Sequence, residues 1–191
     1  MIISADEVGF DLDGVIANTA EAFLRIACTK HGYCSYTAED ISNFELIDCI
    51  DIPQPIIESI FDDIQKDSLA TGLIPIVGAV KTLNALACEN SITIITARSF
   101  KTPVLDWIDN FFPAQTRDAI KVIVTGDHND KIRHIHKNKL RFFIDDRAET
   151  CLQLTQAGIT PFVYSQPWNR HRHSLQTVEN WDEIHTLLGK P

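Results

Sequence analysis

Short apolar runs separated by amphipathic stretches are the feature that most limits how this chain can fold. Five such runs are rich in Val, Ile and Phe, and each is short enough to form a buried strand. Strands that alternate with helices of modest length predict an α/β fold, in which helices cover a parallel sheet. The expected strands are residues 8–12, 92–95, 120–124, 142–144 and 161–164.

The gap between the first two expected strands is too long for a single crossover helix. Roughly eighty residues lie there, whereas a crossover connection needs about a dozen. Two stretches in the gap, residues 19–30 and 56–64, have the amphipathic pattern of helices. We therefore expect a small helical cap over residues 19–72, inserted into a catalytic core made of residues 1–18 and 73–191.

Composition and charge narrow the classes of function. The chain has 191 residues, 45% of them hydrophobic, and a formal net charge of -9. No apolar run approaches the roughly 20 residues that span a bilayer, and the first expected strand begins too close to Met1 to leave room for a signal peptide. The negative charge disfavours binding to a nucleic-acid polymer or an anionic membrane. We expect a cytoplasmic protein with neither of these partners, and the sequence leaves its oligomeric state open.

The cysteines do not suggest a disulfide framework or a zinc site. There are five of them, an odd number, and none has CxxC spacing. We interpret them as reduced thiols that mostly fill the core. They are Cys28, Cys34, Cys49, Cys88 and Cys151.

Two aspartates, Asp11 and Asp13, come at the end of the first expected strand. Because side chains alternate along an extended chain, both carboxylates point to the same side. Carboxylates this close repel each other unless a proton or a cation lies between them, and a divalent hard metal is the natural partner. A calcium loop does not fit, because Gly14 comes fourth instead of sixth. A pair of solvated turn aspartates stays a second interpretation.

The second expected strand leads into a turn that can hold phosphate. Thr96, Ala97 and Arg98 offer a hydroxyl, backbone amides and a guanidinium. An ordinary threonine cap before the next helix explains the same residues. Lys131 begins a polar helical stretch before the fourth expected strand, where a single lysine is usually a solvated surface charge.

The fourth expected strand ends in adjacent acids, Asp145 and Asp146. Alternation along the strand sends these side chains to opposite sides, so one can bind a metal directly and the other can support the site from behind. Gly126 and Asp127 are similar to another form of this acidic motif, but they precede Lys131 and follow the third strand, which argues against that assignment.

Together, the segments DLDG (Asp11 to Gly14), ITAR ending at Arg98, Lys131, and IDDR with Asp145 and Asp146 resemble the haloacid-dehalogenase-like superfamily of phosphohydrolases. The resemblance implies a Rossmann-like sheet with strand order 5-4-1-2-3, helices on both faces and a cap after the first strand. Within the superfamily, the chain is similar to the 5'(3')-deoxyribonucleotidase and related nucleotidase group. That similarity rests on the IDDR motif, the small cap and two short segments, residues 41–44 and 167–169.

The resemblance also implies roles for the motif residues. Asp11 would attack phosphorus to form an aspartyl-phosphate, and Asp13 would protonate the leaving group and later activate water. Mg²⁺ would be bound by Asp11, Asp145 and the backbone carbonyl of Asp13. Asp146 would orient metal-bound water or the lysine. The phosphate would be held by Thr96, Ala97, Arg98 and Lys131.

The position of the lysine is where this chain departs from the nucleotidase pattern. In the nucleotidases it lies closer to the IDD motif than Lys131 does, which makes Lys137 and Lys139 alternatives. We expect Lys131, because the start of its helix lies near the strand ends and the far end of that helix lies at the opposite edge.

Three aromatic residues bear on the identity of the substrate. Phe44, Phe61 and Trp168 could stack on a base, although aromatic residues in a helical cap more often belong to the core. The expected function is Mg²⁺-dependent hydrolysis of a small phosphomonoester such as a (deoxy)nucleoside monophosphate. The alternatives are a phosphatase of another metabolite such as a sugar phosphate, a phosphotransferase, and a phosphate-binding protein without turnover. The basic segment 170–173, from Arg170 to His173, is expected on the surface.

Overall fold

Buried β-branched and aromatic side chains build the sheet at the centre of the protein. The computed structural model describes residues 3–189. Within this range all five expected strands are present, and a sixth strand, which is only two residues long, was not predicted. The strands are β1 (Val8–Phe10), β2 (Ile92–Thr96), β3 (Ile120–Val124), β4 (Phe142–Asp145), β5 (Thr160–Tyr164) and β6 (Thr177–Val178).

The strand order confirms the predicted sheet. The order is β3-β2-β1-β4-β5-β6, which contains the predicted 5-4-1-2-3 arrangement with β6 added beside β5. All of the pairings are parallel, and β1 is central, with Phe10 opposite Ile94 of β2 and Ile144 of β4. A central strand in a parallel sheet is covered on both faces, which explains why β1 is buried along its whole length.

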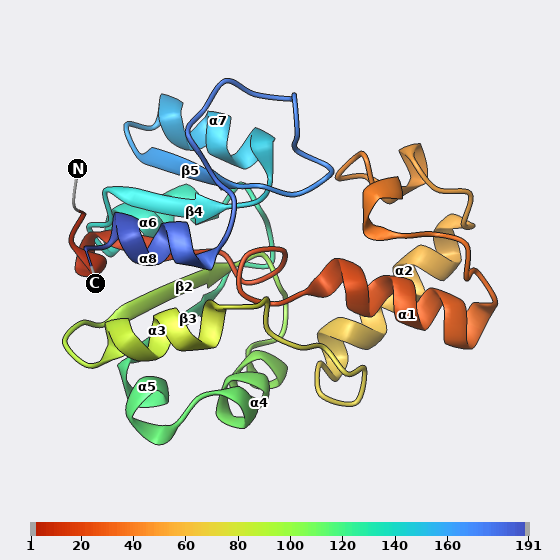
Figure 1. Ribbon diagram of the computed structural model, residues 1–191, viewed down its shortest axis with the longest axis horizontal. Coiled ribbons are helices and arrows are strands. Elements are labelled where there is room, and N and C mark those ends of the chain that lie inside the picture. Colours follow the sequence, from red (N-terminus) through yellow and green to blue (C-terminus); the bar gives the residue numbers. More distant parts are fainter. Residues whose placement is uncertain (1–2, 190–191) are drawn as a thin grey trace.

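Helices cover both faces of the sheet, as the alternating pattern predicts (Figure 1). Alternate strand residues point into two separate hydrophobic clusters. On one face, Phe10 stacks on Trp181 of α8 with 5.7 Å between ring centroids. On the other face, Phe143 packs with Ile135 of α6. The helices of this part are α3 (Ala79–Ala87), α4 (Lys101–Phe111), α5 (Ala114–Ala119), α6 (Lys131–Lys137), α7 (Ala148–Gln156) and α8 (Trp181–Leu187).

The residues between β1 and α3 form a helical unit that lies to one side of the sheet (Figure 1). We refer to residues 19–72 as the insertion. Its α-helices pack against each other, with Phe23 of α1 stacked on Phe61 of α2 at 5.2 Å between ring centroids. The insertion contains α1 (Thr19–His31), α2 (Gln54–Lys66) and the short 3-10 helices η2 (Ala38–Asp40) and η3 (Leu46–Asp48). A third 3-10 helix, η1 (Ala5–Glu7), precedes β1.

The basic segment 170–173 reaches across from the core to the insertion. Arg170 Nη1 lies 2.6 Å from Glu39 Oε2, and Arg172 Nη2 donates to the carbonyl oxygen of Ser42 at 3.1 Å. These residues were expected on the surface without an assigned role. The loop after β5 therefore contacts η2 and the residues that follow it.

The described part of the chain contains no helix with the length and apolar character needed to cross a membrane.

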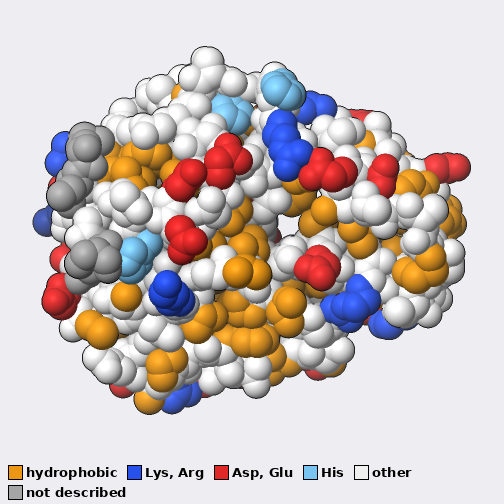
Figure 2. Space-filling view, in the orientation of Figure 1, with side chains coloured by type: hydrophobic (Ala, Val, Ile, Leu, Met, Phe, Trp, Pro, Cys, Tyr) orange, Lys and Arg blue, Asp and Glu red, His pale blue; other side chains and the backbone are white. Residues whose placement is uncertain are grey.

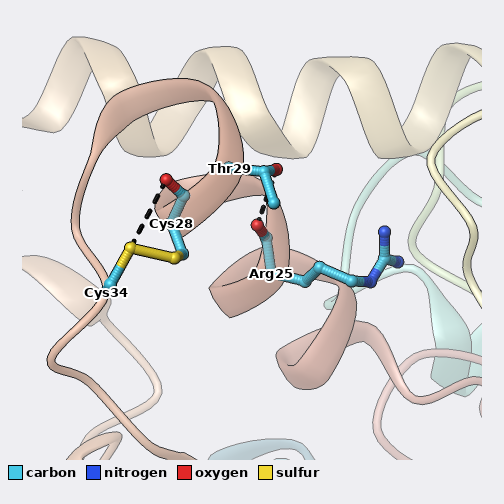
Figure 3. The surroundings of a disulfide bond; sticks show 4 residues. All are labelled: Arg25, Cys28, Thr29 and Cys34. Atoms are coloured by element: carbon cyan, nitrogen blue, oxygen red, sulfur yellow. Dashed lines mark hydrogen bonds between the residues drawn. A yellow bond between two sulfur atoms is a disulfide. The ribbon is translucent and has the colours of Figure 1, made fainter.

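The expectation that all five cysteines are reduced thiols is wrong for two of them. Cys28 and Cys34 form a disulfide with 4.3 Å between their Cα atoms (Figure 3). Helix α1 ends at Gly32, whose left-handed backbone turns the chain back toward the last helical turn. A six-residue spacing across a helix end has no simple sequence signature, and the search for CxxC pairs missed it. Cys49, Cys88 and Cys151 are free.

Thiol counting tests this assignment. We expect iodoacetamide to modify three cysteines in the denatured, non-reduced protein and all five after reduction with dithiothreitol, as measured by intact mass spectrometry. Peptide mapping should assign the two additional sites to Cys28 and Cys34. Five modified cysteines without reductant would contradict the disulfide.

Gly78 provides a test of the packing between α3 and α8. Its φ is +89°, and an added Cβ would come within 2.8 Å of Trp181 Cβ. Gly158 has a similar φ of +78° with open space around the same position. We expect Gly158→Ala to lower the free energy of unfolding by about 1–2 kcal/mol through backbone strain. Gly78→Ala should cost about 1–3 kcal/mol more because of the steric clash. Equal losses in urea unfolding would refute this packing.

Candidate active site

Three carboxylates gather where the neighbouring strands β1 and β4 end. Asp11 follows β1 directly, and its backbone N–H donates to Ile144 O at 2.9 Å, which continues the pairing of the two strands. Asp145 is the last residue of β4, and Asp146 comes next. One oxygen from each of the three side chains can be chosen so that all lie within 4.8 Å of one another. The register of the sheet therefore brings together acids that are far apart in the sequence.

Lys131 lies between two of these acids. Its Nζ is 2.9 Å from Asp11 Oδ2 and 2.7 Å from Asp145 Oδ2, and its side chain is fully buried at the start of α6. Burial alone would lower the pKa of Lys131, but the negative charges of Asp11 and Asp145 outweigh this effect and raise it. The alternatives Lys137 and Lys139 are both exposed. The first turn of α6 thus places a permanent cation in the site.

The donor set fits a divalent cation. Carboxylate oxygens are the ligands that Mg²⁺ prefers, and the buried Oδ1 of Asp11 has no hydrogen-bond partner among the described residues. Burial raises the pKa of Asp11 to about 7. The charge of Lys131 lowers this pKa in part, and the charge of Asp145 raises it further. A second positive charge at Oδ1 would favour the ionised form of this carboxyl group.

Asp13 has a different set of partners. Arg98 donates from Nε to Asp13 Oδ2 at 2.8 Å and from Nη2 to Oδ1 at 2.7 Å, and the Thr19 hydroxyl also donates to Oδ1. Burial alone would raise the pKa of Asp13, but the Arg98 guanidinium and these hydrogen bonds outweigh burial and lower it. Two carboxylates two residues apart are therefore shifted in opposite directions.

Asp146 accepts hydrogen bonds from the loop that follows β5. Trp168 Nε1 donates to Asp146 Oδ2 at 2.9 Å, and the Asn169 side chain donates to the Asp146 carbonyl oxygen at 2.7 Å. Burial, followed by the charges of Asp145 and Asp11, raises the pKa of Asp146. The adjacent Gly14 makes room for this carboxylate, because an added Cβ would collide with Asp146 Oδ2.

The turn after β2 is ordered by its own hydrogen bonds. Thr96 is buried, and its Oγ1 accepts from the backbone N–H of Arg98 at 3.2 Å. Ala97 lies between them at the same strand end. The guanidinium of Arg98 faces Asp13 and also donates from Nη1 to Ser68 Oγ at 2.6 Å. Phosphate binding by Thr96, Ala97, Arg98 and Lys131 stays a prediction.

A cavity of about 390 Å³ joins the carboxylates to the insertion. It is lined by Asp11, Asp13 and Asp146 at one end and by apolar side chains of α1, α2 and the loop between them elsewhere. Phe44, Phe61 and Trp168 all line it, although stacking on a base stays a prediction. Figure 2 shows hydrophobic side chains along the hollow between the two parts of the molecule.

The loop residues Phe44 and His128 both line this cavity and contact each other. Their rings meet edge to face at 5.5 Å, and the Arg147 guanidinium lies 4.9 Å from the Phe44 ring centroid. Burial, followed by Lys131, lowers the pKa of His128 to about 4, so His128 is neutral near pH 7. The described residues that line the cavity include Glu45 and Glu58 but no lysine or arginine.

Sequence reasoning did not identify several of these contacts. Thr19 was interpreted only as a helix start, and nothing in the sequence linked Ser68 or His128 to the site. Trp168 and Asn169 were noted as part of a motif, but their hydrogen bonds to Asp146 depend on how the loop after β5 folds. A hydroxyl residue at the start of the helix, five positions after Gly14, is the one local signal that could have pointed to Thr19.

Comparison with known protein families finds a match over nearly the whole chain. The model of the family described as 5' nucleotidase, deoxy (pyrimidine), cytosolic type C matches residues 5–190. No curated protein matches the chain.

Several solved structures have a similar fold. A protein from Clostridium acetobutylicum described as a predicted phosphatase has 13% identity and a TM-score of 0.63, over 96% of this chain and 98% of that one. A predicted phosphoglycolate phosphatase from Haemophilus somnus has 13% identity and a TM-score of 0.60, over 98% and 99%. A HAD family hydrolase from Deinococcus radiodurans, with bound phosphate and sodium, has 14% identity and a TM-score of 0.56, over 97% and 98%. At these identities the similarity shows the fold alone.

The acidic cluster predicts that Mg²⁺ stabilises the folded protein. A ligand at 100 times its Kd adds about 2.7 kcal/mol to the free energy of unfolding, so saturating Mg²⁺ should raise the thermal midpoint measurably. Asp145→Asn should abolish most of this shift, whereas Asp127→Asn, at an exposed acid after β3, should keep it. Differential scanning calorimetry with Mg²⁺ or EDTA measures both. An undiminished shift in Asp145→Asn would exclude this cluster as the Mg²⁺ site.

Proposed function

Because the chain belongs to the family described as 5' nucleotidase, deoxy (pyrimidine), cytosolic type C, and is a phosphatase of the haloacid-dehalogenase-like superfamily, we propose that it hydrolyses nucleoside monophosphates through an aspartyl-phosphate. The observation that carries this proposal is the position of Asp11. Its carboxylate is buried beside Lys131 and Asp145, and it lines an apolar cavity of about 390 Å³. The nucleophile and the space for a nucleoside are thus adjacent.

In the first step, a carboxylate oxygen of Asp11 attacks phosphorus, and the bond between phosphorus and the ester oxygen breaks. Asp13 gives its proton to the departing oxygen, which leaves as the alcohol of the nucleoside. Lys131 lies beside Asp11 and stabilises the phosphoryl oxygens as their charge is redistributed. A carboxylate is a weak nucleophile, so its fixed position at the end of β1 supplies much of the advantage.

In the second step, water attacks the phosphorus of the aspartyl-phosphate, and the bond to the Asp11 oxygen breaks. Asp13 takes a proton from that water, which restores the protonation state it had at the start of the cycle. Inorganic phosphate leaves and Asp11 is regenerated. The lowered pKa of Asp13 favours its ionised form, which is the base of this second step. The first step needs the protonated form, which the negative charge of a phosphate bound nearby would favour.

Mg²⁺ is the proposed cofactor, held by Asp11, Asp145 and the backbone carbonyl of Asp13. When bound, it offsets the repulsion between the anionic nucleophile and the anionic phosphate. Asp146 supports the site from its hydrogen bond to Trp168. Without a metal ion, the carboxylates together with Lys131 would give the site a net negative charge, which is unfavourable for binding a phosphate dianion.

The charge of the cavity supports an uncharged leaving group. Glu45 and Glu58 line the cavity, His128 is neutral, and none of its described lining residues is a lysine or an arginine. A carboxylate on the leaving group, as in phosphoglycolate, would be desolvated there without a counter-ion. A nucleoside brings a planar ring that suits Phe44, Phe61 and Trp168.

Three other functions of the site are alternatives. A sugar phosphate also has a neutral leaving group, although its hydroxyls would find few hydrogen-bond partners on apolar walls. A phosphotransferase would use the same first step and replace water by an acceptor alcohol. A phosphate-binding protein without turnover would have no use for an acid placed two residues after a nucleophile. The cytoplasm is the proposed location, which the description of the family as cytosolic supports, although a disulfide is uncommon in that compartment.

Turnover of a substrate panel tests the proposal. We expect the wild-type protein with Mg²⁺ to prefer nucleoside monophosphates over 2-phosphoglycolate by at least about tenfold in kcat/KM, because a buried unpaired charge is strongly disfavoured. Asp11→Asn should lower kcat by about 10³-fold or more. Asp127→Asn is the matched control. A preference for phosphoglycolate, or turnover in Asp11→Asn close to that of the wild type, would overturn the proposed function.

A further inference from the structure

Arg98 is a buried cation whose position the proposed reaction leaves unexplained. Its side chain is only 4% exposed, and its guanidinium donates hydrogen bonds to Asp13 from both Nε and Nη2. The remaining terminal nitrogen, Nη1, donates to Ser68 Oγ at 2.6 Å. Arginine binds carboxylates in this two-pronged way because its donors lie in one rigid plane. Such an arrangement fixes the orientation of Asp13 as well as its charge.

The two carboxylate oxygens of Asp13 are not equivalent. Oδ1 accepts hydrogen bonds from Arg98 and from the Thr19 hydroxyl, which uses both of its lone-pair directions. Oδ2 accepts one hydrogen bond, from Arg98 Nε, among the described residues. The Asp13 side chain is 32% exposed and lines the cavity. Oδ2 therefore keeps one direction open for a proton.

We propose that Arg98 is a positioning residue, which holds Asp13 so that Oδ2 is the atom that exchanges the proton with the leaving group and with water. This inference rests on the proposed function, since it assigns an atom to the proton-transfer step. In the first step the proton on Oδ2 moves to the ester oxygen as the bond from phosphorus to that oxygen breaks. In the second step Oδ2 takes a proton from the attacking water.

A purely structural role is the main competing explanation. Ser68 is buried and follows α2, and its hydroxyl also donates to Ile64 O at 3.0 Å. Arg98 could then serve only to fasten the insertion to the core. Ser68→Ala removes this link and leaves both bonds between Arg98 and Asp13 in place, which makes it a matched control.

Leaving-group dependence separates the two roles. An alkoxide such as that of a nucleoside needs a proton to depart, whereas p-nitrophenolate departs readily without one. For Arg98→Lys, which keeps the charge but loses the two-pronged contact, we expect about a 10²-fold loss of kcat/KM with a nucleoside 5'-monophosphate. The loss with p-nitrophenyl phosphate should be less than about tenfold. Ser68→Ala should affect both substrates equally. Equal losses for both substrates in Arg98→Lys would overturn the proposal.

A double-mutant cycle provides a second readout. In an Asp13→Asn background there is no acid left to position, so adding Arg98→Lys should cost less than about threefold with the nucleoside monophosphate. A further loss of about 10²-fold in that background would also overturn the proposal. Should Arg98→Lys fail to fold in circular dichroism, Thr19→Val serves instead, because Thr19 is the other donor to Oδ1. A smaller loss that is again selective for the nucleoside monophosphate is then expected, and an unselective one counts against positioning.

Failure of the proposed function gives a different result. A wild-type protein that hydrolyses neither substrate in the presence of Mg²⁺ contradicts the reaction. Crystal structures of the wild type and Arg98→Lys then decide the positioning role. We expect the Asp13 carboxylate to rotate away from its wild-type orientation in the variant, and an unchanged orientation would refute the role assigned to Arg98.

Discussion

Repulsion among buried carboxylates is the constraint on which the rest of this site depends. The parallel pairing of β1 and β4 forces Asp11, Asp145 and Asp146 into one small space, where charge is costly because water is excluded. Lys131 compensates part of that charge from the first turn of α6. The remainder would be offset by a divalent cation at Asp11 Oδ1, which has no hydrogen-bond partner among the described residues. The fold thus creates a cluster of like charges that the proposed binding of a cation would stabilise.

The opposite pKa shifts of two neighbouring aspartates follow from the same layout. Asp11 faces the other acids and its pKa rises, whereas Asp13 faces Arg98 and its pKa falls. Environments that separate the pKa values of paired groups commonly divide catalytic roles between them. Under the proposed function, a cation bound beside Asp11 would oppose the first shift, because metal binding favours the carboxylate form. Asp13 already has its cation in the Arg98 guanidinium.

The sequence predicted the sheet well, because buried strands of a parallel sheet are continuous apolar runs and each was visible as such. It also placed Asp11, Asp145 and Lys131 at strand and helix ends that the structure brings together. It could not predict β6, since two residues carry no periodicity, or the disulfide from Cys28 to Cys34, which depends on the turn at Gly32. The partners of Arg98 depend on the side-chain arrangement between distant segments, which no local pattern encodes.

The charged groups and the apolar wall of the cavity come from different parts of the molecule. The acids and both cations that face them come from the core, while the insertion contributes most of the apolar wall of the cavity. Contacts at Arg170, Arg172 and Ser68 join the two parts at separate points, and the one at Ser68 is buried. Under the proposed function, changes in the wall would alter which leaving group fits without disturbing the carboxylates at the strand ends.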